Sequence, residues 1–493
     1  MIYQHMNALI EKAIQTGLIE KRDHIYVRNQ IMPYLKLDGD KETDSTSRSD
    51  ASIPDLLKEL VDYAVRQQII GDVFDEKEIL AANIMNCFVA RPSVINAVFR
   101  EKYSQSPEAA TDYFYHLSKD SNYIQMKRIE KNIHFKANTT YGDLDITINL
   151  SKPEKDPEQI KRERENKKKI DYPKCVLCVE NEGYEGRTGY PARANHRVIE
   201  VPLLGETWYL QYSPYVYYNE HSIVLAEEHR DMKIDKKGFE RLLAFIDQFP
   251  HYFIGSNADL PIVGGSILSH DHYQGGRYRF AMTDAEEAFS FQLDDYDHVT
   301  AHVLKWPLSV IRLNCSDKQD LLDAAEHILQ TWQNYSDESI DIKAYSGDTP
   351  HNTITPIARI RHDVYELDLV LRNNRTSEEH PTGIFHPHAD VHHIKKENIG
   401  LIEVMGLAVL PPRLKDELAE IKEYLLDKTS HIEDYHLDWA QAIKAKHGTI
   451  STPNDAELII QQELGLKFAK VLEDAGVFKE KSAFDRFIKT LNK

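Results

Sequence analysis

Apolar residues recur at three- and four-residue spacing through most of the N-terminal part of the chain, as they do on one face of a helix. Residues 7–14 and 54–65 show this spacing most clearly, and the polar stretch 38–50 between them predicts a surface loop. Apolar and polar positions then alternate with a period of two over residues 141–150, which predicts a strand. We therefore expect residues 1–170 to form a mainly helical N-terminal region.

Two successive segments share a strand-rich pattern that ends in a pair of histidines. The first segment, residues 171–310, contains three short strand-like runs and an amphipathic helix, and the second, residues 311–425, contains a helix and two longer runs. Residues 426–493 return to helical spacing and form a tail. The pattern predicts an α+β fold with two sheet-containing halves of similar style. The expected strands are 198–201, 207–212, 222–225, 353–361 and 364–372, and the expected helices are 237–246 and 318–334.

The run Gly264–Gly276 is the most distinctive sequence in the chain, because two histidines two residues apart stand between two pairs of glycines. Residues i, i+2 and i+4 of a strand share one face, so we expect His270, His272 and Gln274 to point the same way. The glycines leave room for anionic oxygens to approach backbone N–H groups. The run therefore predicts a strand that meets a phosphate group.

His272 is the candidate nucleophile of this strand. A neutral imidazole nitrogen attacks phosphorus, and the phosphoramidate that forms is reactive enough to be discharged again. Gln274 favours transfer over hydrolysis, because an amide can hold a phosphoryl oxygen by a hydrogen bond but cannot titrate to activate water. The alternative is that the two histidines are only packed or hydrogen-bonded residues of a strand.

Composition narrows the class of protein. A formal net charge of −19 in 493 residues argues against a general affinity for DNA or RNA, which requires basic surface. No apolar run approaches the roughly 20 residues that span a bilayer, and the first residues lack the basic and apolar regions of a secretion signal. Four cysteines cannot form a disulfide framework in a chain of this length. We therefore expect a cytoplasmic protein that binds neither nucleic acid nor membranes.

Cys175 and Cys178 form a C-x2-C pair, a spacing typical of half a tetrahedral zinc site or of a redox pair. The other two cysteines stand alone, so histidines would have to complete a metal site. His229, which follows a strand-like run, and His270 are the candidates. The alternative is a pair of partly buried thiols with no metal.

Five segments carry a resemblance to a known family: residues 26–29, 141–153, 175–187, 269–276 and 385–388. They resemble galactose-1-phosphate uridylyltransferases of the histidine-triad superfamily, in particular the second type, found in Gram-positive bacteria. The resemblance covers essentially the whole chain. It implies two histidine-triad-like antiparallel-sheet halves between a helical N-terminal region and a helical tail. It also implies ping-pong transfer of UMP from UDP-glucose to galactose 1-phosphate through a uridylyl-histidine, a reaction of galactose metabolism.

The resemblance assigns roles to residues at matching positions. His272 matches the nucleophile, and Gln274 matches the residue that contacts the transferred phosphoryl group. The chain departs from the expected pattern in two places. Asp271 stands where the better-known first type of the family has proline between the two histidines, and Gln211 stands before Pro214 where many members of the superfamily have asparagine. The resemblance implies a zinc cofactor, with ligands Cys175, Cys178, His229 and His270.

Further residues are candidates for substrate binding. Donors in the glycine-flanked loop should stabilise charge on the phosphoryl oxygens, and Arg277 should supply charge for a diphosphate. Asn257 is a candidate for positioning the nucleotide, or else an ordinary turn residue. Lys395 is a candidate for a sugar phosphate across the interface of a homodimer, or else a solvent-exposed lysine. The loop donors are Gly264, Gly265, Ser266 and Ser269.

Two other functions fit parts of this pattern. A nucleotide hydrolase or phosphorylase of the same superfamily would use the same nucleophile but would pass the nucleotide to water or phosphate. A zinc-dependent nucleotide-binding regulator would bind without turnover. Steady release of UMP from UDP-glucose would indicate the hydrolase, and purely noncovalent binding would indicate the regulator.

Overall fold

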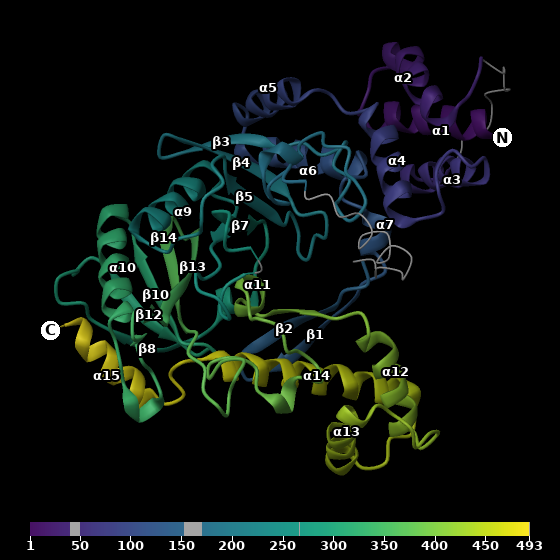
Figure 1. Cartoon of the computed structure of the whole chain (residues 1–493). Helices are drawn as coiled ribbons and strands as arrows, with labels where there is room; N and C mark the ends of the chain where they lie inside the picture. Colours follow the sequence, from purple (N-terminus) through teal and green to yellow (C-terminus); the bar gives the residue numbers. More distant parts are fainter. Residues whose placement is uncertain (40–49, 152–169, 266, 493) are drawn as a thin grey trace. The chain divides into compact units, whose positions relative to one another are not determined.

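The computed structural model describes residues 1–39, 50–151, 170–265 and 267–492. The chain divides into two compact units (Figure 1). Unit 1 comprises residues 1–131, 151–216 and 220–229, and unit 2 comprises residues 132–150, 217–219 and 230–493. These units are defined by contacts within the structure, so each combines segments that are separate in the sequence. The four consecutive parts expected from the sequence stay a prediction. Residues 152–169, just before the boundary expected at residue 170, lie outside the described residues.

The N-terminal part of unit 1 is helical, as the apolar spacing predicts. Helix α3 begins after Ser52, whose hydroxyl accepts a hydrogen bond from the Asp55 N–H at 3.4 Å. Its apolar stripe is buried in a core shared with α1, where Leu9 and Leu60 are fully buried. The helices are α1 (Ile2–Gln15), α2 (His24–Ile31), α3 (Ile53–Arg66), α4 (Phe74–Asn86), α5 (Pro92–Tyr103), α6 (Pro107–Asp120) and α7 (Met126–Ile129).

Unit 1 also contains three antiparallel strands at the positions that alternation predicts. They are β3 (Ile199–Leu203), β4 (Glu206–Tyr212) and β5 (Ser222–Ala226). Ile199 lies opposite Leu210, which in turn lies opposite Val224, and all three side chains are buried. This register places these three side chains on one face of the sheet.

Unit 2 is built on seven strands in the order β7-β6-β13-β14-β10-β9-β8, all paired antiparallel to their neighbours. Helices α9 (Lys236–Gln248) and α10 (Lys318–Gln333) pack on one face of this sheet (Figure 1). The strands are β6 (Phe253–Gly255), β7 (His272–Gly276), β8 (Glu287–Phe291), β9 (Thr300–Leu304), β10 (Val310–Cys315), β13 (Asn352–Arg361) and β14 (Val364–Asn373). The helices and strands expected at 237–246, 318–334, 353–361 and 364–372 are thus confirmed.

A buried ion network holds β10, β13 and β14 together. The Arg312 guanidinium donates to Asp368 at 2.7 Å, and the Arg359 guanidinium donates to Glu366 at 2.6 Å. All four side chains are nearly inaccessible, so each charge has its partner in place of water.

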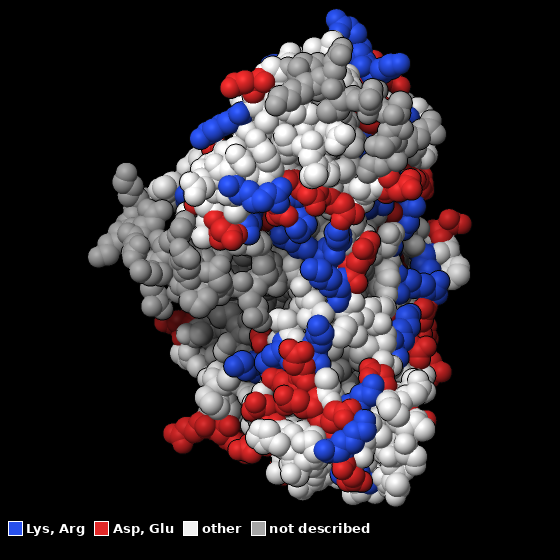
Figure 2. All heavy atoms as spheres, turned by 90° about the vertical axis from the view of Figure 1, so that its right-hand side faces the viewer, with Lys and Arg blue, Asp and Glu red and all other residues white. Residues whose placement is uncertain are grey.

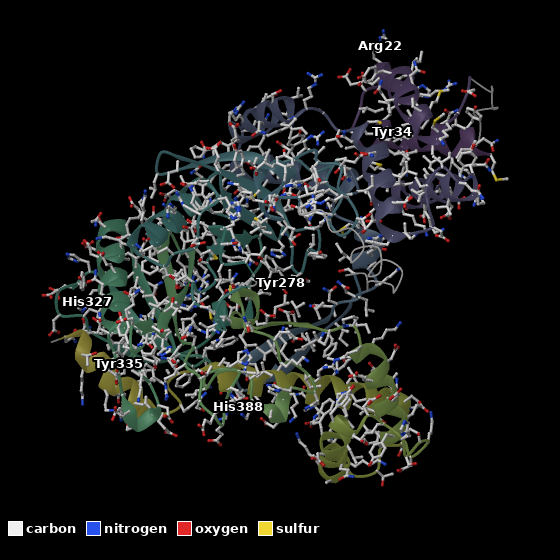
Figure 3. All side chains as sticks on the ribbon, viewed as in Figure 1. Arg22, Tyr34, Tyr278, His327, Tyr335 and His388 are labelled. Carbon is white, nitrogen blue, oxygen red and sulfur yellow. The ribbon has the colours of Figure 1, made fainter. Side chains whose placement is uncertain are left out.

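The rest of unit 2 comprises a small sheet and the C-terminal helices. The small sheet has the order β1-β2-β15, and the strand expected at 141–150 is β2. In α10, His327 donates from Nε2 to the Leu491 carbonyl of α15 at 2.7 Å, which fixes the last helix (Figure 3). These elements are β1 (Ile133–Thr139), β2 (Gly142–Ile148), β11 (Tyr345–Ser346), β12 (Thr349–Pro350), β15 (Leu407–Leu410), α11 (Leu401–Val404), α12 (Leu414–Leu425), α13 (Asp434–His447), α14 (Pro453–Ala475) and α15 (Lys481–Leu491).

The architecture is a mixture of helices and antiparallel sheet, as the α+β expectation states. Acidic and basic side chains are interspersed on the face drawn in Figure 2. Among the described residues, no helix combines the length and the apolar character needed to cross a membrane.

Candidate active site

Strand β7 carries the candidate nucleophile and pairs with β6. Gln274 lies opposite Gly255, which itself lies opposite Ile357 of β13. A Cβ at Gly255 would stand 2.8 Å from the Pro356 carbonyl oxygen and 2.9 Å from Leu401. Glycine is therefore required at this position because backbone and a covering side chain approach it closely.

The imidazole of His272 is held as a single neutral tautomer. The side chain is buried, and its Nδ1 lies 2.7 Å from the carbonyl oxygen of His270. Because a carbonyl oxygen can only accept, Nδ1 carries the proton and Nε2 keeps its lone pair. Burial lowers the pKa of His272 to about 4, with a further lowering by the nearby His270 ring and an opposing effect of the carbonyl. The ring is therefore uncharged near pH 7.

Asp271 anchors the backbone between the two histidines. Its N–H donates to the carbonyl of Arg230 at 2.7 Å, and its carboxylate accepts from Arg230 Nε at 3.3 Å. The Arg241 guanidinium on α9 lies 3.9 Å from the same carboxylate. Burial raises the pKa of Asp271, and the two arginines oppose this shift. Asp271 is thus fixed by ionic and backbone contacts.

Alternation along this segment follows the expectation in part. Asp271 and Tyr273 both face α9, since the Tyr273 hydroxyl lies close to Gly238 of that helix. Strand β7, however, begins only at His272, so His270 precedes the strand. Two backbone hydrogen bonds explain this late start. The Leu268 carbonyl accepts from the Met232 N–H at 2.8 Å, and the Asp271 N–H donates to the Arg230 carbonyl. Residues 268–271 therefore run beside residues 230–232 before they pair with β6.

The glycine loop before the histidines is tightly packed. A Cβ at Gly264 would stand 2.5 Å from the Ala258 carbonyl oxygen, and one at Gly265 would stand 2.8 Å from Asn257 Nδ2. Glycine is therefore required at position 264, where backbone approaches closely, whereas at position 265 a larger residue would have to displace the Asn257 side chain. Ser266 lies outside the described residues, and Ser269 is exposed.

Asn257 and Lys395 have structural contacts that the sequence does not announce. Asn257 is buried, and its Oδ1 accepts from the Leu401 N–H at 2.8 Å, which holds the start of α11. Lys395 is buried rather than solvent-exposed, and its ammonium donates to Glu403 at 3.0 Å and to the Val409 carbonyl at 3.1 Å. Their roles in substrate binding stay predictions, as do those of the half-buried Gln274 and Arg277.

Three of the four expected metal ligands meet in unit 1. The ligand atoms of Cys175, Cys178 and His229 lie within 4.8 Å of one another. The two sulfurs are 3.4 Å apart, and Cys178 Sγ lies 3.1 Å from His229 Nδ1. Asn181 Nδ2 donates to the carbonyls of both cysteines at 2.8 Å, which holds the C-x2-C turn. Two thiols and an imidazole are a donor set that suits zinc.

His270, the fourth expected ligand, belongs to unit 2 and is fully buried. Sequence reasoning missed Arg230 and Arg241, the two cations at Asp271. The available signal was the acid itself, because a charge at a position that alternates into the sheet interior requires a partner.

Two family models match this chain. The N-terminal domain of galactose-1-phosphate uridyl transferase matches residues 17–231, and the C-terminal domain of the same family matches residues 244–441. Together they span most of the sequence.

Full-length relatives agree with these matches. Galactose-1-phosphate uridylyltransferase of Clostridium perfringens strain SM101 is 52% identical, over 99% of this chain and 99% of the relative. The enzyme of the same name from Fusobacterium nucleatum is 52% identical over 98% and 97%, and that from Bacillus subtilis strain 168 is 51% identical over 99% and 98%. The chain therefore belongs to the galactose-1-phosphate uridylyltransferase family.

Proposed function

We propose that this chain transfers a uridylyl group from UDP-glucose to galactose 1-phosphate, with His272 as the covalent carrier. The observation that supports it most is the His272 tautomer, whose Nδ1 proton is bound to the His270 carbonyl at 2.7 Å. This bond leaves the Nε2 lone pair for attack, and the low pKa of about 4 keeps that lone pair unprotonated. A neutral nitrogen nucleophile is what the first step requires.

In the first step, Nε2 forms a bond to the α-phosphorus of UDP-glucose, and the bond from that phosphorus to the bridging oxygen breaks. The oxygen leaves with glucose 1-phosphate. In the second step, a phosphate oxygen of galactose 1-phosphate attacks the same phosphorus, and the phosphorus–nitrogen bond breaks to give UDP-galactose. His272 returns to its neutral form, so the cycle consumes no water.

The residues around His272 complete the proposal. Gln274 follows it by two positions on β7, so both point to the same side of the strand. An amide there donates to a phosphoryl oxygen without activating water, which favours transfer. The glycine loop, Arg277 and Asn257 remain the candidates for holding the diphosphate and the nucleotide.

Zinc is part of the same proposal, with His270 as the fourth ligand beside Cys175, Cys178 and His229. Asp271 N–H donates to the Arg230 carbonyl at 2.7 Å, and each of these residues directly follows one of the two histidines in the chain. Covalent connection thus favours His229 and His270 as neighbours. A bound zinc ion would supply a structural cross-link, because four protein ligands leave no open position for substrate.

The remaining features of the family belong to this proposal as well. We infer that the two sheet-containing halves are histidine-triad-like and that the enzyme acts in the cytoplasm as a homodimer. The substrates are small molecules, a sugar nucleotide and a sugar phosphate. These features rest on the family relation.

Isotope exchange tests the reaction type. The protein is mixed with UDP-glucose and labelled glucose 1-phosphate, without galactose 1-phosphate. A covalent transferase should move label into UDP-glucose and release almost no UMP, and the exchange should disappear in His272→Ala. The second half of the chain contains a pair of the same spacing, His386 and His388. The matched control is His388→Ala, which removes one histidine of this second pair and should leave exchange near the wild-type rate. Steady UMP release without exchange would show a hydrolase instead.

A further inference from the structure

A cavity of about 680 Å³ lies in unit 2 among the C-terminal helices. The residues that line it lie between residues 389 and 467, more than 100 positions after strand β7. It is lined by the segment after His388, by the residue before α12, and by α13 and α14. Lys395, the candidate for sugar-phosphate binding in the segment after His388, does not line this cavity. Three kinds of side chain meet there: aromatic rings, ammonium groups and carboxylates.

Aromatic rings form one wall of this cavity. Tyr435 and Trp439 lie four residues apart on α13 and therefore share one side of the helix. The His393 ring lies 5.5 Å from the Trp439 ring, and the Arg413 guanidinium lies 5.7 Å above the Tyr435 ring. Such a wall offers flat apolar area beside polar groups, as sugar and cofactor pockets do.

Two ammonium groups face the cavity without an acidic partner. Lys467 donates only to the backbone carbonyl of Asp390, at 3.3 Å, and within the described ranges neither Lys467 nor Lys396 forms an ion pair with a carboxylate. Arg413 differs, since Glu417 accepts its hydrogen bond at 2.5 Å. The two lysines are therefore the charges left for a ligand.

Two carboxylates line the same cavity and are also left without an ion pair, as far as the described residues show: Asp390 and Asp438. The buried Nε2 of His393 has no hydrogen-bond partner either. Burial lowers the pKa of His393 to about 4, so its ring is neutral and can accept or donate one bond. Asp390, Asp438 and Lys396 are exposed to solvent, so their charges are open to a ligand that enters the cavity.

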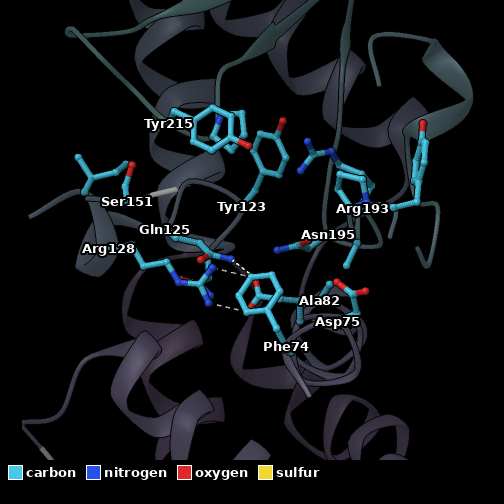
Figure 4. A pocket seen from close by; sticks show the side chains of 18 of the residues that line it. Phe74, Asp75, Ala82, Tyr123, Gln125, Arg128, Ser151, Arg193, Asn195 and Tyr215 are labelled. Atoms are coloured by element: carbon cyan, nitrogen blue, oxygen red, sulfur yellow. Dashed lines mark hydrogen bonds and ion pairs between the residues drawn. The ribbon is translucent and has the colours of Figure 1, made fainter. Parts of the chain in front are cut away.

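The cavity in unit 1 provides a contrast. Arg128 lines it and is already bound by Glu78, through hydrogen bonds of 2.6 and 3.1 Å, and Gln125 donates to the same carboxylate at 2.8 Å (Figure 4). The charges of Arg128 and Glu78 are thus paired with each other within the protein. In the cavity of unit 2, by contrast, the described residues provide no ion pair for the two lysines or the two aspartates that line it.

We propose that the cavity of unit 2 binds a sugar phosphate monoester as a site separate from the one at His272. Lys396 and Lys467 match the two negative charges of the monoester. Asp390 and Asp438 accept hydrogen bonds from sugar hydroxyls, and Trp439 covers the face of the sugar ring. An enzyme that consumes and releases hexose phosphates would then carry a second site that senses the same class of compound.

Tryptophan fluorescence of the full-length protein tests this site. Glucose 6-phosphate is the probe, because its phosphate is not on the anomeric carbon and it cannot enter the proposed transfer. We expect a saturable change in the millimolar range or below, lost in Trp439→Phe. In Lys396→Gln and Lys467→Gln, the half-saturating concentration should rise about tenfold or more, since each loses a charged hydrogen bond.

Controls separate this site from general effects. Lys489→Gln removes one exposed charge from α15 of the same unit and should leave the titration unchanged. Thermal midpoints check that all variants fold. An absent fluorescence change, or one that persists unaltered in both lysine variants, would overturn the proposal. Equal affinity for inorganic phosphate alone would overturn the assignment of a sugar.

Discussion

The chain contains two histidine pairs of identical spacing, and the structure treats them differently. His272 opens strand β7, where the carbonyl of His270 fixes its tautomer at 2.7 Å. His388 lies in a loop, where its Nε2 donates to the Ile384 carbonyl at 3.0 Å and its ring stacks on His380 with centroids 4.2 Å apart (Figure 3). Both pairs read His-x-His in the sequence. Backbone context therefore decides which imidazole can act as a nucleophile.

The surroundings explain the contrast. Before β7, Asp271 binds Arg230 through both its backbone and its carboxylate, so the ring of His272 projects from a fixed strand. In the second pair, the backbone N–H of His388 donates to Asp474 at 3.1 Å, and the imidazole serves the packing of the loop. A nitrogen of His272 thus stays available, whereas His388 uses its backbone N–H and its Nε2 to hold the loop.

Replacing the nucleophile should give the largest effect. His272→Ala should lower the rate of uridylyl transfer by about four orders of magnitude, because a removed covalent nucleophile is not replaced by the rest of the site. His388→Ala should stay within about threefold of wild type. Steady-state assays with UDP-glucose and galactose 1-phosphate measure both. Comparable losses in the two variants would remove the distinction between the pairs.

Removing the acid beside the nucleophile should give the next largest effect. Asp271→Asn keeps the shape but leaves two arginines facing a neutral group, so kcat should fall about 10- to 100-fold with little change in KM. The free energy of unfolding should drop by about 1 to 3 kcal/mol, because Arg241 is buried whereas Arg230 is partly exposed. Asp284→Asn is the control, since its partner Arg279 is exposed, and it should lose less than about 1 kcal/mol. Unchanged kcat in Asp271→Asn would show that the contact does not position His272.

The metal content of the purified protein tests the proposed zinc site, to which His270 of the first pair would belong. Cys175→Ser should lower bound zinc, measured by elemental analysis of purified protein, and should lower the thermal midpoint by several degrees. Cys315→Ser should keep the metal, because this buried cysteine lies on β10 and is not in the thiol and imidazole cluster. Equal metal content in all three proteins would contradict the proposed ligands.

The smallest expected effect is a change in stability with pH, caused by protonation of His386 in the second pair. Burial lowers the pKa of His386 below its ordinary value, so the unfolded chain binds a proton there before the folded chain does. Stability should therefore decrease as the pH falls below about 6.5, the ordinary value of histidine. His386→Asn should reduce this decrease by about 1 kcal/mol or less between pH 7 and pH 5. Denaturant unfolding at the two pH values measures it, and an unchanged slope would show that His386 titrates normally.

Much of this fold follows from local pattern. Alternation predicts strands β2, β3, β4, β5, β13 and β14, and helical spacing predicts α9 and α10, because periodicity records which face of each element is buried. The H-x-H-x-Q run and the C-x2-C pair identify His272 and the thiol cluster for a similar reason, since their chemistry depends on short spacing.

Contacts between distant residues could not be predicted in this way. Arg230 and Arg241 meet Asp271 only through tertiary packing, and Lys395 is buried by its bond to Glu403 although isolated lysines are ordinarily exposed. The start of β7 at His272 depends on backbone hydrogen bonds from the preceding residues to the segment 230–232. A single sequence carries no record of these partners, so the structure was needed to find them.

Mapping the covalent intermediate tests the central claim most directly. The protein is incubated with UDP-glucose alone, digested under non-acidic conditions that preserve a phosphorus–nitrogen bond, and sequenced by tandem mass spectrometry. We expect one uridylyl group on the peptide that contains His272, assigned to that imidazole, and its loss on addition of galactose 1-phosphate. A uridylyl group on another residue, or none despite active transfer, would contradict the account.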